Sequence, residues 1–162
     1  MENDGHLYED ELLGISWIEN SFNTLGVFFS LNHDETKSVN IQEKISTIKS
    51  ILNTWKARNL SLNGKITILK SLVLPHIQIL ASFLQVDKKD IENLDTIMFD
   101  FLWTKGQPLI AKNTIIQTTH LGGLKMLSAW EVFKTAKIMW IKRFTNSVKA
   151  KWKSISHFLL GI

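Results

Sequence analysis

The sequence predicts a mainly α (α+β) protein, a helical bundle with a short β-hairpin near its N-terminus. Several long segments carry apolar residues three and four positions apart, which is the spacing of an amphipathic helix. β-Branched and aromatic runs bounded by polar residues, which are typical of strands, stand out mainly in the first 30 or so residues. With 44% hydrophobic and 21% charged residues among 162, the chain has the composition of a globular domain.

The N-terminal part of the chain divides into a leader and a hairpin. Residues 1–12 are polar and lack any periodicity, so we expect a disordered leader there. The runs 13–17 and 22–30 flank the polar residues 19–21, which predicts an antiparallel hairpin over 13–31. Because two strands alone are marginally stable in water, this hairpin must pack on the helices or on a sheet outside this chain.

Residues 37–104 are expected to form a helical region, after a polar connector over 32–38. Apolar residues in the segment 39–58 step by four, three, four and three positions along one helical stripe: Ile41, Ile45, Ile48, Leu52 and Trp55. Ser61 is expected to cap a second helix over 65–74. Pro75 lacks an amide donor, so a kink or break should separate that helix from a helical segment over 76–84.

The rest of the chain predicts three more helices. Asp87 offers a capping oxygen for a third helix that ends near residues 105–108. Short β-prone runs allow a second short hairpin near 109–118. Ser128 and Glu131 have the spacing of a capping box that opens a fourth helix over 129–144, and a fifth, basic helix follows over 149–160. The region 105–162 is therefore expected to be a basic hairpin followed by helices, and it ends on apolar residues as though truncated.

Charge is distributed very unevenly along the chain. Residues 1–36 contain eight acidic and no basic residues, whereas residues 37–162 contain all 19 basic residues and seven acidic ones, a net charge of +12. A basic body of this kind favours a polyanionic partner such as nucleic acid. Lysine-rich solvated helix faces would give the same totals.

No catalytic or metal-binding constellation is evident in the sequence. Cysteine is absent, and no two of the five histidines are four positions apart, as a helical metal site with two histidine ligands needs. His6 has Glu2 and Asp10 at that spacing, but it lies in the leader, where the sequence shows no helical periodicity. We therefore expect no enzymatic activity and no cofactor. The polar N-terminus does not resemble a signal peptide, and the unbroken apolar runs are short, so we expect an intracellular protein with no membrane partner.

Two basic stretches are candidates for nucleic-acid binding. The first flanks the turn between the first two helices and combines four cations with polar donors: Lys56, Arg58, Lys65 and Lys70 with Asn59, Ser61 and Asn63. The second covers residues 134–153, where Trp140, Phe144 and Trp152 alternate with lysines. The helical spacing of these aromatic residues favours a place in the core over base stacking.

Several short motifs, in order, resemble the LINE-type (non-LTR) retrotransposon reverse transcriptases. The segment 22–27, Phe-Asn-Thr-Leu-Gly-Val, resembles the segment that closes the palm of these enzymes. Trp-Lys at 55–56, Asn-Leu-Ser-Leu-Asn-Gly-Lys-Ile at 59–66 and Leu-Pro at 74–75 resemble the run in the thumb. Phe-Leu-Trp at 101–103, Ile-Ala-Lys at 110–112 and Gly-Gly-Leu-Lys-Met at 122–126 are similar to elements at and behind the thumb. The likeness extends over residues 22–145, about three-quarters of the chain.

The resemblance implies a parent enzyme that copies RNA into DNA by target-primed reverse transcription, with magnesium bound by palm aspartates. This sequence has no Tyr-x-Asp-Asp motif, no endonuclease segment and no Cys/His knuckle. The resemblance therefore implies a non-catalytic fragment: the palm edge over 13–31, a thumb-like region over 37–104 and the start of the downstream region over 105–162.

The thumb of such enzymes holds the primer–template duplex through its backbone, and six residues here match that region: Lys56, Arg58, Ser61, Gly64, Lys65 and Lys70. Gly64 is expected to permit close approach of the nucleic-acid backbone at a bend, whereas Trp55, Pro75 and Trp103 are expected to be architectural. We expect micromolar binding of RNA/DNA or DNA duplex that weakens steeply with salt.

Two alternatives to duplex binding remain. The chain could be an α-helical interaction module that docks onto a palm-containing polypeptide, which exposed side chains of Ile15, Trp17, Val27 and Phe28 would favour. It could also be a decayed, non-functional retroelement remnant.

Overall fold

The structure, a computed structural model, describes residues 9–10, 15–16, 20–103, 107–146 and 150–160. The strands are β1 (Glu9–Asp10), β2 (Ile15–Ser16), β3 (Ser21–Thr24) and β4 (Val27–Ser30). The helices are α1 (His33–Lys56), α2 (Leu62–Ile68), the π-helix η1 (Leu69–Val73), α3 (Leu74–Phe83), α4 (Lys88–Leu102), α5 (Lys112–Ile116), the 3-10 helix η2 (Thr119–Leu121), α6 (Ala129–Thr145) and α7 (Lys151–Leu160). The expected disordered leader lies largely outside the described residues.

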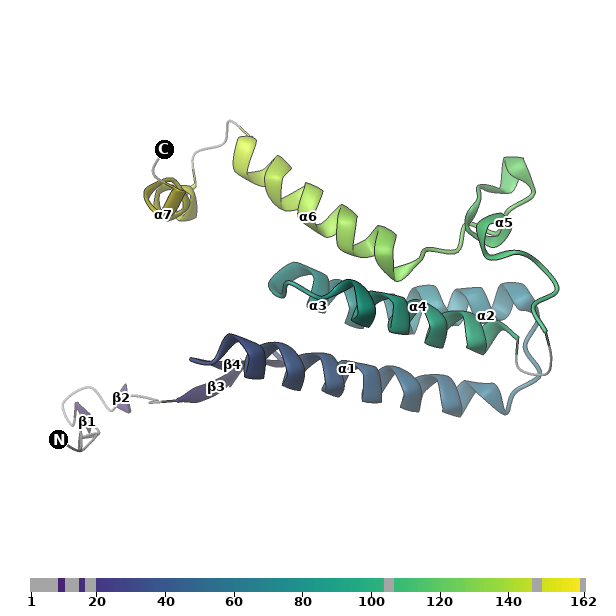
Figure 1. Cartoon of the computed structure of the whole chain (residues 1–162), viewed down its shortest axis with the longest axis horizontal. Coiled ribbons are helices and arrows are strands. Elements are labelled where there is room, and N and C mark those ends of the chain that lie inside the picture. The colour runs from purple at the N-terminus through teal and green to yellow at the C-terminus, as the bar shows by residue number, and fades with distance from the viewer. Residues whose placement is uncertain (1–8, 11–14, 17–19, 104–106, 147–149, 161–162) are drawn as a thin grey trace.

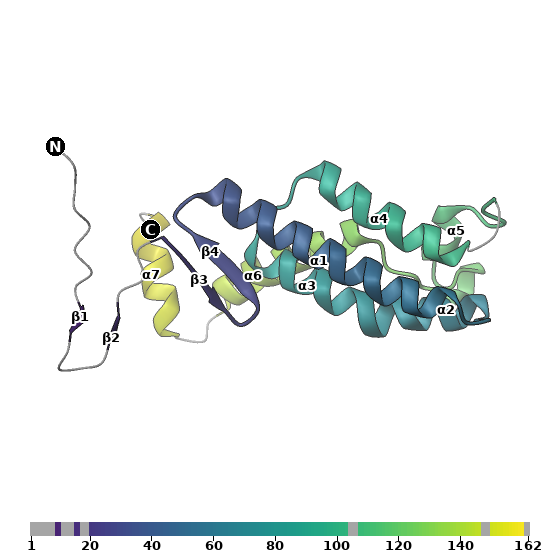
Figure 2. The ribbon, with the colours of Figure 1, turned by 90° about the horizontal axis from the view of Figure 1, so that it is seen from below.

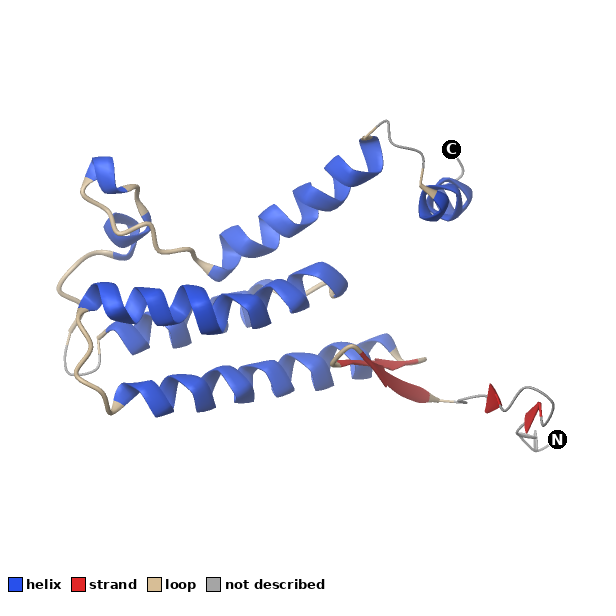
Figure 3. Ribbon diagram, turned by 180° about the vertical axis from the view of Figure 1, so that it is seen from behind, coloured by secondary structure: helices blue, strands red, loops and turns tan. Residues whose placement is uncertain are grey.

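The long helices stack in three layers, with α1 on one side, α2 to α4 in the middle and α6 on the other side (Figure 1). Helix α3 contacts both α1 and α6, and α4 contacts α1, α2 and α6. The view from behind shows the same order, with the hairpin at one end of α1 (Figure 3). The predicted fold class, mainly α with a short N-terminal hairpin, is confirmed.

A single apolar core joins these layers. Its most buried members come from every layer and include Ile48, Leu69, Val73, Ile77, Leu94, Met98, Ile115, Met126 and Ala129, which are all at most 1% exposed. The predicted stripe of the first long helix contributes Ile41, Ile48 and Leu52 to the core, with Ile45 and Trp55 packed at its edge. Burial of these side chains is the main term that stabilises the bundle.

The N-terminal hairpin lies entirely within residues 21–30, so the predicted pairing of 13–17 with 22–30 is wrong. Strands β3 and β4 pair in the register Phe22↔Phe29 and Thr24↔Val27. The turn between them consists of Leu25 and Gly26, with φ values of +51° and +73°. Positive φ at both central residues matches the twist of a tight two-residue hairpin, which explains why the chain reverses inside the run. Residues 15–16 pair instead with residues 9–10.

A buried asparagine holds the hairpin on α1. Asn40 is 1% exposed, its Oδ1 accepts the Phe28 amide at 2.9 Å, and its Nδ2 donates to the Phe28 carbonyl at 2.7 Å. Lys44 adds a hydrogen bond from Nζ to the Gly26 carbonyl at 3.0 Å. The hairpin therefore packs on the helices, one of the two supports expected for it.

Two helix starts differ from the prediction, the first in its position and the second only in its capping hydrogen bond. The expected polar connector over 32–38 is helical from His33, because Asn32 Oδ1 accepts the Asp34 amide at 2.9 Å and acidic residues occupy the first turn. Asp87 sits at the N-cap of α4 but makes no side-chain capping bond, since its carboxylate pairs with Lys37. That ion pair is also the main reason why the pKa of Lys37 is raised.

The expected interruption at Pro75 takes the form of a π-helical segment. Helices α2 and α3 are continuous through η1, and the Leu74 amide donates to the Leu69 carbonyl across the wider turn. A π-turn lets the chain pass a proline, which has no amide to donate, without ending the helix. By length and composition alone, the combined run Leu62–Phe83 could cross a bilayer. In this fold its residues Leu69, Val73 and Ile77 are buried in the core.

The allowed second hairpin near 109–118 is not formed. Residues 112–116 form α5, and the Ile115 carbonyl accepts the amides of Leu124 and Met126 at 3.1 and 3.2 Å. A side chain at Gly123 would place its Cβ 2.0 Å from the Gln117 carbonyl oxygen, so this close approach requires glycine. The β-prone residues 114–116 are therefore helical, and the segment that follows them folds back onto α5 before α6 begins.

Asp95 connects α4, α5 and the start of α6. This residue is 6% exposed, and its carboxylate accepts the Ala129 amide at 2.6 Å and Lys112 Nζ at 3.1 Å. Ser128 caps the same helix by accepting the Glu131 amide at 3.3 Å. The predicted cap of α6 is therefore confirmed for the serine, while the Glu131 carboxylate pairs with Lys134 at 3.7 Å.

Candidate nucleic-acid interface

The first basic stretch lies at one corner of the bundle, where α1 ends, α2 begins and α4 ends. A hollow of about 440 Å³ opens there. It is lined by three cations, two amide side chains and apolar residues: Lys56, Arg58, Lys65, Asn59, Gln107, Leu60, Leu102, Trp103 and Leu109. None of these described lining residues is acidic. We call this hollow the basic corner.

Arg58 is positioned by an aromatic side chain of α1. Its guanidinium carbon lies 4.4 Å from the ring centroid of Trp55, and Trp55 packs against the core. The Arg58 amide donates to the Trp55 carbonyl at 3.1 Å, which fixes the backbone of the turn. Stacking covers one face of the guanidinium and leaves its N–H edge able to meet the oxygens of a phosphate.

Lys65 joins α2 to the end of α4. Its Nζ donates to the Leu102 carbonyl at 2.8 Å and lies 5.9 Å from the centroid of the Phe101 ring. A cation at a helix C-terminus is favourable because the last carbonyls lack intrahelical partners. Burial lowers the pKa of Lys65. The residue therefore has a structural role at the corner as well as a place in its lining.

Gly64 does not form the expected bend. It lies within α2, and the chain turns earlier, at residues 57–61. Its amide donates to Ser61 Oγ at 3.2 Å, so this amide is already used in the helix cap. A Cβ at Gly64 would make only ordinary contacts, the nearest being Ser61 Oγ at 3.4 Å. The expectation that Gly64 provides a bend is wrong, whereas the predicted cap by Ser61 is confirmed.

The structure divides the six sequence-predicted residues into groups. Lys56, Arg58 and Lys65 line the basic corner. Ser61 lines a neighbouring hollow of about 280 Å³ together with Asn63 and Gly122. Lys70 is exposed on η1 and lines neither of these hollows.

The basic corner also contains residues that the motifs did not point to. Gln107 comes from the segment that follows α4, more than 40 positions after Arg58. Trp103, expected to be architectural, lines the hollow as well. No local pattern signals Gln107, because only the packing of α4 against α2 brings it to the corner.

The second basic stretch differs from its prediction. Trp140 and Trp152 are 40% and 39% exposed, so the expectation that they lie in the core is wrong. Their rings meet edge to face at 6.0 Å, and the Arg143 guanidinium lies 5.6 Å from the Trp140 ring. These contacts hold α7 beside the end of α6 rather than presenting a row of free ring faces.

The chemistry available at the basic corner is anion binding. Among the described residues, no group of three or more histidine, aspartate or glutamate side chains could hold a metal ion. Three cations and two amides around an open hollow can bind phosphate oxygens by charge and hydrogen bonds.

No protein-family model matches the sequence, and no curated protein matches it. The resemblance to LINE-type reverse transcriptases therefore depends on the order of the sequence motifs alone.

Proposed function

We propose that this chain is a non-catalytic helical module that binds the sugar–phosphate backbone of an RNA/DNA or DNA duplex, like the thumb of a LINE-type reverse transcriptase. The observation that carries the proposal is the basic corner, where Lys56, Arg58 and Lys65 from two helices and a turn surround one open hollow. Local charge at the corner agrees with the net charge of +12 over residues 37–162. Both favour a polyanion without base-specific contacts.

In this proposal, polymerisation belongs to a palm with magnesium-binding aspartates, which the family's Tyr-x-Asp-Asp motif would mark. This sequence does not contain the motif. In this proposal the chain binds the duplex and does not catalyse polymerisation. Magnesium-dependent primer extension by this chain alone would contradict the assignment.

The test is a titration of the whole chain onto a fluorescein-labelled RNA/DNA hybrid of about two helical turns, followed by anisotropy at several salt concentrations. We expect micromolar affinity at low salt and a linear fall of log affinity with log salt concentration. Affinity that does not change between low and high salt would refute the phosphate contacts. A DNA duplex of the same length serves as the comparison for RNA preference.

The alternative function, docking on a palm-containing polypeptide, is favoured by the hairpin. Leu25 at its tip is 91% exposed, and Phe22 and Leu31 are 46% and 81% exposed. Val27, whose exposure would favour docking, is only 4% exposed because it faces the helices, and Trp17 lies outside the described residues. A surface of this kind would bind a partner through apolar contacts that do not weaken with salt. The salt titration therefore separates the two functions.

A further inference from the structure

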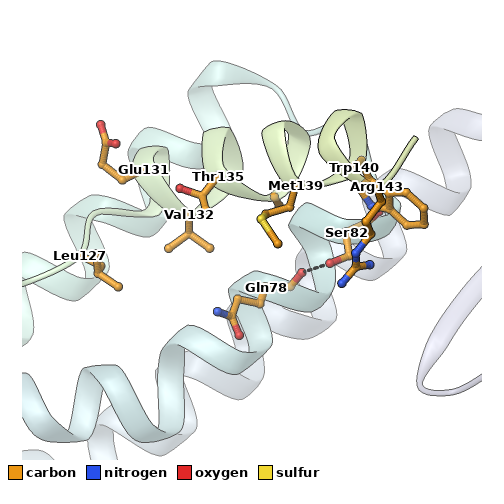
Figure 4. A pocket seen from close by; sticks show the side chains of 10 residues that line it. Gln78, Ser82, Leu127, Glu131, Val132, Thr135, Met139, Trp140 and Arg143 are labelled. Atoms are coloured by element: carbon orange, nitrogen blue, oxygen red, sulfur yellow. Dashed lines mark hydrogen bonds between the residues drawn. The ribbon is translucent and has the colours of Figure 1, made fainter. Parts of the chain in front are cut away.

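A groove runs between α3 and α6, separate from the basic corner. Residues of α3, α6 and the segment before α6 line its volume of about 390 Å³: Gln78, Ser82, Leu127, Glu131, Val132, Thr135, Ala136, Met139, Trp140 and Arg143. Figure 4 shows Val132 and Met139 pointing from α6 toward Gln78 and Ser82 on α3. Seen from below, α6 lies partly behind α3 along the bundle (Figure 2).

The groove combines an apolar surface with a few polar groups. Leu127, Met139 and Trp140 are 45%, 44% and 40% exposed along it. The α3 wall supplies the Gln78 amide and the Ser82 hydroxyl, which donates to the Gln78 carbonyl at 2.8 Å. Apolar side chains with few polar groups are typical of a groove that receives an amphipathic helix.

Charge gives the groove a direction. Glu131 lies at its end near the start of α6, with Lys134 as a partner at 3.7 Å, and Arg143 lies at the other end. Among the described residues that line the groove, Arg143 is the only basic one and Glu131 is the only acidic one. The end of the groove at Arg143 therefore attracts carboxylates and the negative end of a helix dipole.

We propose that this groove binds an amphipathic helix of a partner polypeptide, with acidic residues in its last turns. The partner helix runs parallel to α6, because its negative C-terminal end then lies at Arg143 and its positive N-terminal end lies at Glu131. The span from Glu131 to Arg143 is about 18 Å at ~1.5 Å per residue, the length of three to four helical turns. This surface does not use the nucleic-acid contacts proposed above.

Other occupants fit the groove less well. A second copy of the same face offers no free helix to the groove, because its α6 already packs on α3 and α4. A bilayer surface would leave the side-chain amide of Gln78 on the α3 wall against hydrocarbon. Base stacking needs a free ring, but Trp140 is held by its Nε1–H bond to the Ser82 carbonyl at 3.1 Å, by Arg143 and by the edge of Trp152.

The test measures binding of labelled helical peptides of about 16 residues to the whole chain by anisotropy. The probe peptide has an apolar stripe and glutamates in its last two turns. One control peptide carries lysines in place of these glutamates, and the other carries the glutamates in its first two turns. We expect micromolar binding of the probe and at least tenfold weaker binding of the other two. Equal affinity for all three peptides would overturn the proposal.

Two matched variants locate the site. Met139→Gln removes an apolar side chain from the groove, whereas Ile141→Gln removes one that is 63% exposed and does not line the groove. We expect about tenfold weaker binding for the first variant and less than about a twofold change for the second. Arg143→Glu should reverse the preference between the acidic and basic peptides. Equal effects of both glutamine variants would overturn the proposal. Binding of phosphatidylserine vesicles or of a single-stranded oligonucleotide is measured with the same variants. If Met139→Gln weakens the binding of either of these ligands instead of the peptide, the proposal is also overturned.

Discussion

Removing one cation from the basic corner should change how duplex binding depends on salt. Arg58→Gln deletes one of the three charges that line the hollow and keeps a hydrogen-bonding side chain. Loss of the stacking on Trp55, now 4.4 Å from the guanidinium, should cost less than about 1 kcal/mol at this exposed site, so the fold is retained. Lys70→Gln is the matched control, because Lys70 is exposed but does not line the hollow.

The size of the effect follows from counting phosphate contacts. Each neutralised phosphate contributes about −0.9 to the slope of log affinity against log salt, so three cations give about −2.7. Between about 50 and 200 mM salt the wild type should lose about 40-fold in affinity. With two cations the slope becomes about −1.8 and the loss about 12-fold.

The assay is fluorescence anisotropy of the wild type and both variants on one duplex, with circular dichroism to verify folding. Arg58→Gln should have the shallower slope, and Lys70→Gln should keep the wild-type slope. If the two variants reduce the slope equally, binding depends on overall charge and the basic corner has no special role. If neither variant alters it, the duplex lies elsewhere on the chain.

Three further predictions concern the stability of the fold. Asn40→Leu leaves the Phe28 amide and carbonyl without their hydrogen-bond partner. This should lower the free energy of unfolding by about 2 kcal/mol and speed hydrogen exchange at the Phe28 amide. Unchanged exchange would show that other contacts hold the hairpin on α1. Asp95→Ala removes the acceptor of the buried Ala129 amide and should lower the free energy of unfolding in urea by roughly 2–3 kcal/mol, against a negligible change if the contact is dispensable. Burial lowers the pKa of Lys65, so the unfolded chain binds more protons than the folded chain just below pH 10.5. The free energy of unfolding should therefore rise with pH in that window, and the Lys65→Met variant should lose this rise. An identical pH profile for the variant and the wild type would exclude the burial effect.

The helices could be predicted from the sequence because each is encoded by local spacing. The stripe that contains Ile48 and Leu52 and the caps at Ser61 and Ser128 depend only on residues within one helix. The hairpin could not be placed correctly, since Leu25 adopts a positive φ that its residue type does not indicate.

Long-range contacts explain the other differences. The sequence predicts that Asp87 caps its own helix with its side chain. Its carboxylate instead accepts a hydrogen bond from Lys37, 50 positions earlier. Gly64 belongs to the motif that predicts a bend, but it lies inside α2, and the turn at the basic corner is formed by residues 57–61. Of the candidate site, the sequence identified Lys56, Arg58 and Lys65, whereas the contribution of Gln107 depends on tertiary packing.

The most direct measurement of the central proposal is a titration of isotope-labelled protein with RNA/DNA duplex, followed through backbone amide chemical shifts. If the duplex lies at the basic corner, the largest changes should fall on residues 56–65 and on Leu102, Trp103, Gln107 and Leu109, and they should disappear at high salt. Changes confined to α6 and α7, or changes that persist at high salt, would contradict a phosphate grip at this corner.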